Sequence, residues 1–234
     1  MPVTYRSRNL TGNIVSITSH KKFKPTSPST HLTLHDADPI KDRATLEQIK
    51  SHLLFTGRYG HRNWLIFVVG INTARRCGDI LHLTIGDVYD QATNEVVKSV
   101  TKKEQKTGKT LTYYLPDLVR TVIQEYINFI GFYSLDDPLF RSQKGGFMLT
   151  STYWSILKNI RKELDLKFQL STHSMRKTFG YHKYQALKDK KTADGFDIVD
   201  KLQQAYGHSS RKITLGYVGI TEEVQIDLYN TEVL

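Results

Sequence analysis

From residue 42 onward, apolar residues recur mostly at the spacing of helices that pack on a core. Asp42 can cap a helix whose apolar face is formed by Leu46, Ile49 and Leu53. The same kind of pattern continues almost to the end of the chain. It predicts further helices over 64–71, from near Arg76 through Leu83, and over 151–164, 172–188, 196–206 and 209–217, with a short amphipathic helix after them that has Ile220, Val224 and Leu228 four residues apart.

Between residues 96 and 115 the pattern changes to that of strands. The valines of 96–100 precede a lysine-rich turn that ends in Thr107 and Gly108, and apolar residues resume over 111–115. This order predicts a β-hairpin. The expected fold class is therefore mainly α with a small antiparallel β-sheet. After the hairpin, Asp117 is expected to cap a helix with one apolar side made of Leu118, Val122, Tyr126 and Phe129.

Residues 1–38 are expected to form a basic, partly flexible arm. They are rich in Ser, Thr and Lys, and Pro25 and Pro28 disfavour a long helix. The segment 13–17 has the composition of a short strand that could pair with another segment. We therefore predict two units, the arm and a folded domain over 39–234, which closes with a tail helix from about residue 219.

Charge adds a candidate partner to this picture. The chain carries 33 Lys and Arg against 23 Asp and Glu, which gives a net charge of +10. Its first 35 residues contain Arg6, Arg8, Lys21, Lys22 and Lys24 and no acid, whereas the tail after Tyr217 contains acids and no Lys or Arg. So strong a basic excess favours a nucleic-acid partner over the alternative that it serves solubility alone.

Composition disfavours several other classes of protein. The longest apolar run, 64–71, is too short to cross a bilayer, and the N-terminus has no apolar core of the kind found in signal peptides. The single cysteine, Cys77, cannot form an internal disulfide and fits a reducing compartment. We expect a cytoplasmic protein.

Four short segments carry side chains with reactive chemistry. They are 74–79, 102–109, 172–177 and 206–210, and Tyr217 follows nine residues after His208. Each has an ordinary explanation when taken alone. His173 and Arg176 can form a surface pair on a helix, Arg76 can pair with Asp79, the lysine turn can be a solvated hairpin tip, and Gly207 with His208 can be a capping turn.

Together, the four segments supply what attack on a phosphodiester requires. The reaction needs a nucleophile, an acid for the leaving alkoxide, and cations around the charge of the transition state. Arg76 and Arg176 suit the phosphate because a guanidinium fork grips two oxygens and stays protonated. A histidine with a pKa near neutrality can accept or donate a proton, and a lysine on a hairpin can reach the leaving oxygen.

The four segments resemble the tyrosine recombinases of the phage-integrase type, over about residues 40–220 and in the same order. "INTARRCGDILHLTIGDV" is similar to the first arginine box of that family, and "EQKTGKT" to the hairpin with its lysine. "STHSMRKTFGYH" resembles the His-x-x-Arg box, and "AYGHSSRKITLGYVGI" the end of the domain. The resemblance implies the catalytic residues Arg76, Lys106, His173, Arg176, His208 and Tyr217, with Asp79 as the acidic helper.

The resemblance also implies a mechanism. Tyr217 attacks the scissile phosphate and forms a 3′-phosphotyrosine link, while the 5′-hydroxyl leaves with a proton from Lys106. Arg76 and Arg176 hold the phosphate, His173 acts as acid and base, and His208 orients the phosphate. The strand then passes to a partner duplex, and neither metal, ATP nor another cofactor is required.

Double-stranded DNA is the partner that this resemblance implies. The residues expected to contact it are Arg75, Lys103, Lys109, Lys177, Arg211 and Lys212, with Lys21, Lys22 and Lys24 of the arm. The tail is expected to dock on a neighbouring copy, so that dimers to tetramers assemble on DNA; the alternative is a solvated terminal helix. A nucleoid-associated protein of a prokaryote, phage or plasmid is implied.

Three features depart from the family pattern. Only about forty residues precede the catalytic region, where most members have a core-binding domain of about a hundred. Arg75 stands where a small or apolar residue is usual, and Gly216 where an arginine is common. Lys103, Lys106 and Lys109 are equivalent on physical grounds, and Lys106 is preferred because it precedes Thr-Gly at the turn.

Competing interpretations follow from these departures. The short N-terminal region leaves open a DNA-binding regulator or accessory factor on the same fold. A metal-dependent nuclease lacks a supporting motif, and a type IB topoisomerase would share the chemistry without site preference. Among the 13 tyrosines, Tyr206 is expected to pack in the core, and Tyr229 lies in an acidic tail that would repel a phosphate.

Overall fold

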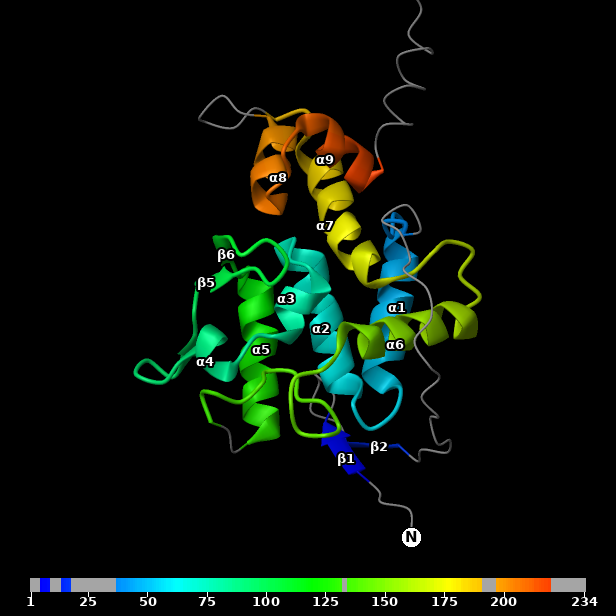
Figure 1. Cartoon of the computed structure of the whole chain (residues 1–234). Coiled ribbons are helices and arrows are strands. Elements are labelled where there is room, and N and C mark those ends of the chain that lie inside the picture. The colour runs from blue at the N-terminus through cyan, green and yellow to red at the C-terminus, as the bar shows by residue number, and fades with distance from the viewer. Residues whose placement is uncertain (1–4, 9–13, 18–36, 132–133, 191–196, 220–234) are drawn as a thin grey trace, which may run out of the picture.

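The computed structural model describes residues 5–8, 14–17, 37–131, 134–190 and 197–219. Its described part is mainly helical with small antiparallel sheets, as predicted (Figure 1). The helices are α1 (Arg43–Phe55), α2 (Gly60–Thr73), α3 (Cys77–Leu81), α4 (Ile85–Val88), α5 (Asp117–Ile130), α6 (Thr150–Glu163), α7 (Thr172–Leu187), α8 (Ile198–Tyr206) and α9 (Arg211–Val218). The strands are β1 (Tyr5–Arg8), β2 (Ile14–Ile17), β3 (Tyr89–Asp90), β4 (Glu95–Val96), β5 (Ser99–Lys103) and β6 (Thr110–Tyr114).

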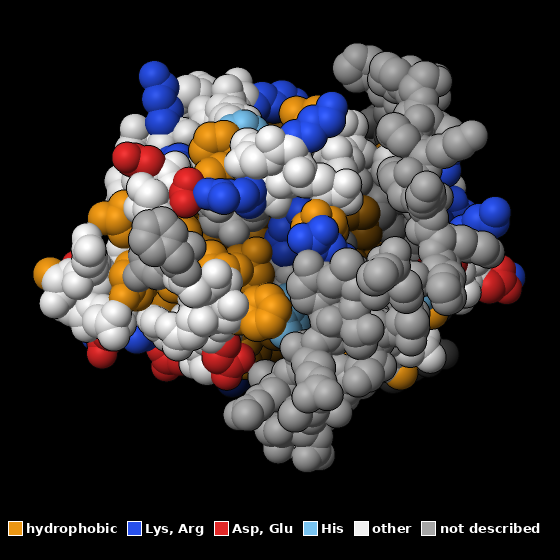
Figure 2. Space-filling view, turned by 90° about the horizontal axis from the view of Figure 1, so that it is seen from below, with side chains coloured by type: hydrophobic (Ala, Val, Ile, Leu, Met, Phe, Trp, Pro, Cys, Tyr) orange, Lys and Arg blue, Asp and Glu red, His pale blue; other side chains and the backbone are white. Residues whose placement is uncertain are grey.

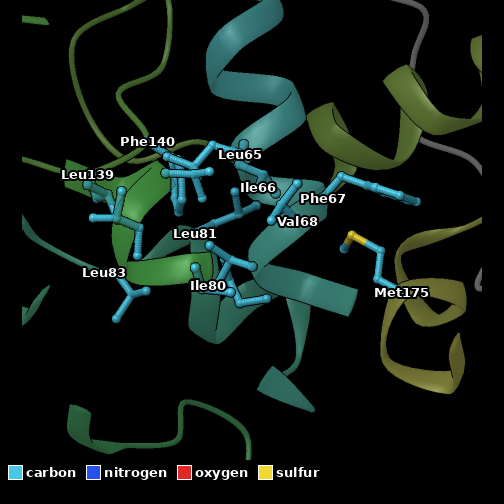
Figure 3. Packing of buried hydrophobic residues seen from close by; sticks show 14 of the residues in the cluster. Leu65, Ile66, Phe67, Val68, Ile80, Leu81, Leu83, Leu139, Phe140 and Met175 are labelled. Atoms are coloured by element: carbon cyan, nitrogen blue, oxygen red, sulfur yellow. The ribbon is translucent and has the colours of Figure 1, made fainter. Parts of the chain in front are cut away.

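Helix α2 forms the centre of the main hydrophobic core. It packs against α1, α5 and α7, and Leu65, Ile66 and Phe67 are fully buried on it (Figure 3). Met175 points from α7 toward α2, where a Cβ at Gly70 would crowd its sulfur. Because glycine leaves room at that point, α7 lies close against the most buried helix of the molecule.

A second, smaller core joins α7, α8 and α9 at one end of the molecule, at the top of Figure 1. Tyr206 and Val218 are fully buried in it, which confirms the prediction of a core position for Tyr206. A Cβ at Gly180 of α7 would collide with the Tyr206 hydroxyl and with Val218. The absence of a side chain at Gly180 therefore lets α8 and α9 approach α7 directly.

The predicted hairpin is β5 and β6, which pair from Ser99↔Tyr114 to Lys103↔Thr110. The expectation of one strand beginning at Val96 was wrong, because Val96 belongs to β4 and pairs with Tyr89 of β3. In the arm, β1 and β2 pair from Tyr5↔Ile17 to Arg8↔Ile14, which gives the strand expected at 13–17 a partner.

Two helix predictions also need correction. The helix expected from Arg76 through Leu83 ends at Leu81, because Thr84 starts α4 through a capping box with Asp87. Asp117 is the first residue of α5 and makes no cap, since Pro116 holds the capping position.

The apolar side predicted for α5 differs from the side that is buried by about one residue position around the helix. Leu118 and Phe129 are 63% and 59% exposed, whereas the buried side consists of Val119, Val122, Ile123 and Ile127. Hydrophobic atoms are also visible among the charged ones on the face that Figure 2 shows. The helical spacing was right, but it does not decide between neighbouring apolar rows when both are present.

The described residues do not include the predicted tail helix with Ile220, Val224 and Leu228. They also do not include Lys21, Lys22, Lys24 and Tyr229. None of the described helices has the length and apolar character that crossing a membrane would need.

Candidate active site

The first arginine box lies at the turn between α2 and α3. Ala74 ends α2 in the left-handed region with φ 58°, and Arg76 then occupies the N-cap position of α3. Its Nη1 lies 2.6 Å from Oε1 of Glu104 and 4.0 Å from Oδ2 of Asp79. The simple explanation of an Arg76–Asp79 pair is therefore incomplete, because the closer partner is the carboxylate of Glu104 on the hairpin.

Helix α7 presents His173 and Arg176 on one face. The helix starts with a capping box between Ser171 and Ser174, and Arg176 is 2% exposed. Nη2 of Arg176 donates to the carbonyl oxygen of Tyr206 at 2.8 Å. Its Nε and Nη1 are buried and have no hydrogen-bond partner within the described part of the chain. Buried donors without an acceptor are costly, so this guanidinium is prepared for an anion.

Helix α9 places Tyr217 beside His173 and Arg176. Its cap is Ser210, whose hydroxyl accepts from the amide of Ile213. The hydroxyl of Tyr217 lies 3.3 Å from Nδ1 of His173, and its ring lies 5.1 Å from that of His208, measured between centroids. Cζ of Arg176 lies 5.8 Å from the centroid of the Tyr217 ring. The structure thus brings the phenol, both imidazoles and one arginine of the sequence prediction together.

Burial and positive charge set the protonation states at this place. Burial raises the pKa of the Tyr217 phenol, although the charges of Arg176 and Arg76 oppose the increase. Burial lowers the pKa of His173, and the charges of Arg176, Lys177, Lys106 and Arg76 lower it further. Burial and the charges of Arg176 and Arg76 lower the pKa of His208 to about 4. At neutral pH the phenol is therefore protonated and both imidazoles are neutral.

Lys106 lies on the exposed turn of the β5–β6 hairpin, as do Lys103 at the end of β5 and Lys109 in the turn. The ammonium of Lys106 contributes to the lowered pKa of His173. Lys106 is therefore close enough to His173 for its charge to act on that imidazole.

The other residues expected to contact DNA have different surroundings. Arg75 is 4% exposed, with Nη1 3.5 Å from Glu104 and Nη2 bonded to the carbonyl of Ala205. Lys177 is buried and donates to the carbonyl of Ala37 at 2.7 Å. Arg211 pairs with Asp197 and Asp200, while Lys212 is exposed. The structure thus directs Arg75 and Lys177 into the protein.

Glu104 belongs to this site, although its sequence pattern indicated no role for it. It is 5% exposed and lies beside both Arg75 and Arg76. The available signal was a lone acid within the basic turn 102–109. Thr214 was also missed; its hydroxyl lies 3.2 Å from Nδ1 of His208 and so supports that ring. Across the described residues, His, Cys, Asp and Glu nowhere form a group of three that could hold a metal ion.

Comparison with known proteins adds the family. The probable integrase/recombinase YoeC of Bacillus subtilis is 29% identical over 191 residues, which cover 81% of this chain and 93% of that protein. The XerA recombinase shares the fold with a TM-score of 0.61 at 18% identity, over 89% of this chain and 68% of that one. The XerH recombinase, solved with a palindromic difH substrate, also has a TM-score of 0.61 at 18% identity. That comparison covers 83% of this chain and 53% of the XerH chain. The model of the phage integrase family matches residues 42–223, which is most of the chain, and this protein therefore belongs to that family.

Proposed function

We propose that this protein cuts and rejoins DNA at specific sites through a covalent bond between Tyr217 and a DNA phosphate. The observation that carries the proposal is the Tyr217 hydroxyl 3.3 Å from Nδ1 of His173, with the Arg176 guanidinium beside the Tyr217 ring. Nε and Nη1 of that guanidinium have no hydrogen-bond partner among the described residues. A nucleophile, a neutral base and a buried cation with free donors are the groups that phosphoryl transfer needs.

In the proposed reaction, the Tyr217 oxygen forms a bond to phosphorus as the bond from phosphorus to the 5′ oxygen breaks. The phenol proton passes to Nδ1 of His173, which lies 3.3 Å away and is neutral because its pKa is lowered. The departing 5′ oxygen takes a proton from Lys106 on the hairpin turn, whose charge acts on His173. The resulting 3′-phosphotyrosine keeps the energy of the broken bond, and attack by a 5′-hydroxyl of another strand reverses these steps.

The two arginines have different tasks in this proposal. Arg176 offers Nε and Nη1 to the non-bridging oxygens, since within the described ranges its Nη2 alone has a protein acceptor. Arg76 adds a second cation. Its side chain is 24% exposed, and its Nη1 pairs with the carboxylate of Glu104. Neutral His208 stands against the Tyr217 ring and can donate to a phosphate oxygen through the nitrogen that does not face Thr214.

DNA is the proposed substrate for two reasons. The net charge of +10 favours a polyanion, and the XerH relative of the same fold was solved on its DNA substrate. Assembly into dimers or tetramers through the tail, and the DNA contacts of Lys103, Lys109, Lys212 and the arm, belong to the same proposal.

Adduct formation tests the proposed function. Duplexes from the DNA that flanks the gene, nicked so that the cut strand escapes, should trap a protein–DNA adduct in EDTA. Tyr217→Phe should abolish the adduct, because the phenyl ring keeps the packing but lacks the attacking oxygen. Tyr114→Phe, at a tyrosine that is 76% exposed, is the matched control and should form the adduct normally.

Two outcomes would contradict the assignment. An adduct that persists in Tyr217→Phe would show that another residue is the nucleophile. Sequence-specific binding without any adduct would favour the alternative, a DNA-binding regulator on the same fold.

A further inference from the structure

Glu104 is a buried carboxylate whose two oxygens face different parts of the site. Oε1 lies 2.6 Å from Nη1 of Arg76 and 3.5 Å from Nη1 of Arg75. Oε2 accepts a hydrogen bond of 2.6 Å from the hydroxyl of Thr107, the residue after Lys106. One side chain therefore joins the arginine box to the turn that carries Lys106.

The remaining attachments of the hairpin tip are also polar. The amide of Gln105 donates to Oδ1 of Asp79 at 3.0 Å, and Lys102 pairs with Asp87 farther along the hairpin. Within the hairpin strands, Val100 is the buried residue. A partly open pocket of about 240 Å³ lies between the hairpin and the arginine box, lined by residues that include Arg75, Glu104 and Tyr113. Apolar packing therefore contributes little to the position of the tip, and charge pairing contributes much.

Thr107 and two arginines keep the carboxylate of Glu104 ionised inside the protein, and Arg75 is the more buried of the two arginines. Burial by itself raises the pKa of Glu104, but the hydrogen bond from Thr107, the close ion pair with Arg76 and the charge of Arg75 outweigh that effect, so the pKa lies below its ordinary value. Arg75 also donates to the carbonyl of Ala205 at the end of α8, next to the carbonyl that holds Arg176. A line of contacts thus runs from the hairpin through Glu104 and Arg75 to the end of α8.

We propose that Glu104 is a positioning residue that holds the Lys106 turn against the arginine box, with Arg75 as its buried counterion. Arg75 then acts inside the protein and does not contact DNA. The inference rests on the proposed function for its consequence, the delivery of a proton by Lys106. The docking of the turn itself is a property of the protein without DNA.

A spin label at the turn tests the docking without DNA. Lys106→Cys in the full chain supplies the reactive thiol, because the native Cys77 is buried and burial raises its pKa. The nitroxide spectrum should show a restricted label. Adding Glu104→Gln, which keeps the shape but removes the charge, should convert most of the label to a mobile form, and Glu104→Asp should retain part of the restriction.

Control and supporting variants make the result decisive. Glu95→Gln, at an exposed acid of β4, should leave the label restricted. Arg75→Gln, checked for folding by circular dichroism, should mobilise the label partly because Glu104 still pairs with Arg76. A label that stays restricted in Glu104→Gln, or that Glu95→Gln mobilises equally, would overturn the proposal.

The consequence for cleavage is tested with native Lys106 on DNA whose bridging 5′ oxygen is replaced by sulfur. A thiolate leaves without a proton, so loss of the acid matters little there. Glu104→Gln should slow adduct formation on ordinary DNA by roughly 10–10²-fold and recover to within a few-fold on sulfur-substituted DNA, as Lys106→Ala should.

A Glu104→Gln defect of equal size on both kinds of DNA would place its effect on Arg76 and the phosphate, and would overturn the link to Lys106. If the unaltered protein forms no adduct on any DNA, the proposed function fails, while the spin-label result still decides whether Glu104 docks the turn.

Discussion

At the scale of single residues, the site combines groups whose protonation is set by burial and neighbouring cations. Tyr217 and His173 are held as a protonated phenol and a neutral imidazole 3.3 Å apart, which is the starting state that proton transfer between them requires. Arg176 has unpartnered buried donors beside them. These residues therefore carry an energetic cost in the free protein that an anion would relieve.

The lowered pKa of His208 predicts a loss of stability in acid. Its pKa is about 4 in the folded protein and near 6.5 in the unfolded chain. Between those values the unfolded chain binds a proton that the folded protein does not, so the full stability present above 6.5 is lost progressively as pH falls toward 4. His208→Gln should remove this part of the loss. Urea unfolding at neutral and acidic pH measures it, and an unchanged pH dependence in the variant would contradict the prediction.

At the scale of elements, the contact of α7 with α8 and α9 positions Tyr217, the proposed nucleophile. Gly180 permits that contact, because a Cβ there would meet Tyr206 and Val218. Tyr206 reinforces it in both directions, since its hydroxyl donates to the carbonyl of Arg176 and its own carbonyl accepts from Arg176. The distance between His173 and Tyr217 thus depends on packing at Gly180, which lies about two helical turns along α7 from His173.

Two glycines of these helices should respond oppositely to alanine. A Cβ at Gly216 of α9 meets open space, so Gly216→Ala should raise the free energy of unfolding by roughly 0.5–1 kcal/mol. Gly180→Ala should lower it by roughly 1–3 kcal/mol, because Tyr206 and Val218 must move. Denaturant titrations compare the two variants; equal effects of the same sign would show that helix propensity, not the close approach, dominates at Gly180.

The elements also show what the sequence could and could not predict. Helical spacing and caps located most helices, and Asp42 caps α1 as expected, accepting from the amide of Thr45 at 2.7 Å. Spacing failed at α5, where two neighbouring apolar rows compete for the core. The partners of Arg75 and Arg76 were also missed, because Glu104 is 28 or more residues away and nothing in a local pattern indicates a contact across that distance.

At the scale of the whole molecule, charge is distributed unevenly along the chain. The first 35 residues contribute five basic residues and no acid to a net charge of +10. In the folded domain, several basic side chains are already paired within the protein, Arg75 and Lys177 in its interior and Arg211 in a surface ion pair. We therefore expect contact with DNA to depend on the exposed lysines and the arm more than the total charge suggests.

Salt dependence of DNA binding tests the contribution of the arm. Replacing Lys21, Lys22 and Lys24 together by glutamine should reduce the slope of log affinity against log salt concentration by about 3, because each phosphate contact releases about one counterion. Replacement of the same three by arginine keeps the charge and should keep the slope. Filter binding or anisotropy at several salt concentrations measures both, and an equal slope for the two variants would remove the arm from the interface.

The backbone at Ala74 has a consequence for how this protein can vary. Its φ of 58° disfavours branched and bulky residues, and its side chain, 1% exposed, leaves no volume for a longer one. A saturation library at codon 74, selected for soluble protein, should therefore return Ala and Gly and little else. In natural or engineered variants of this protein, we expect the residue at position 74, just before the arginine box, to be restricted in the same way.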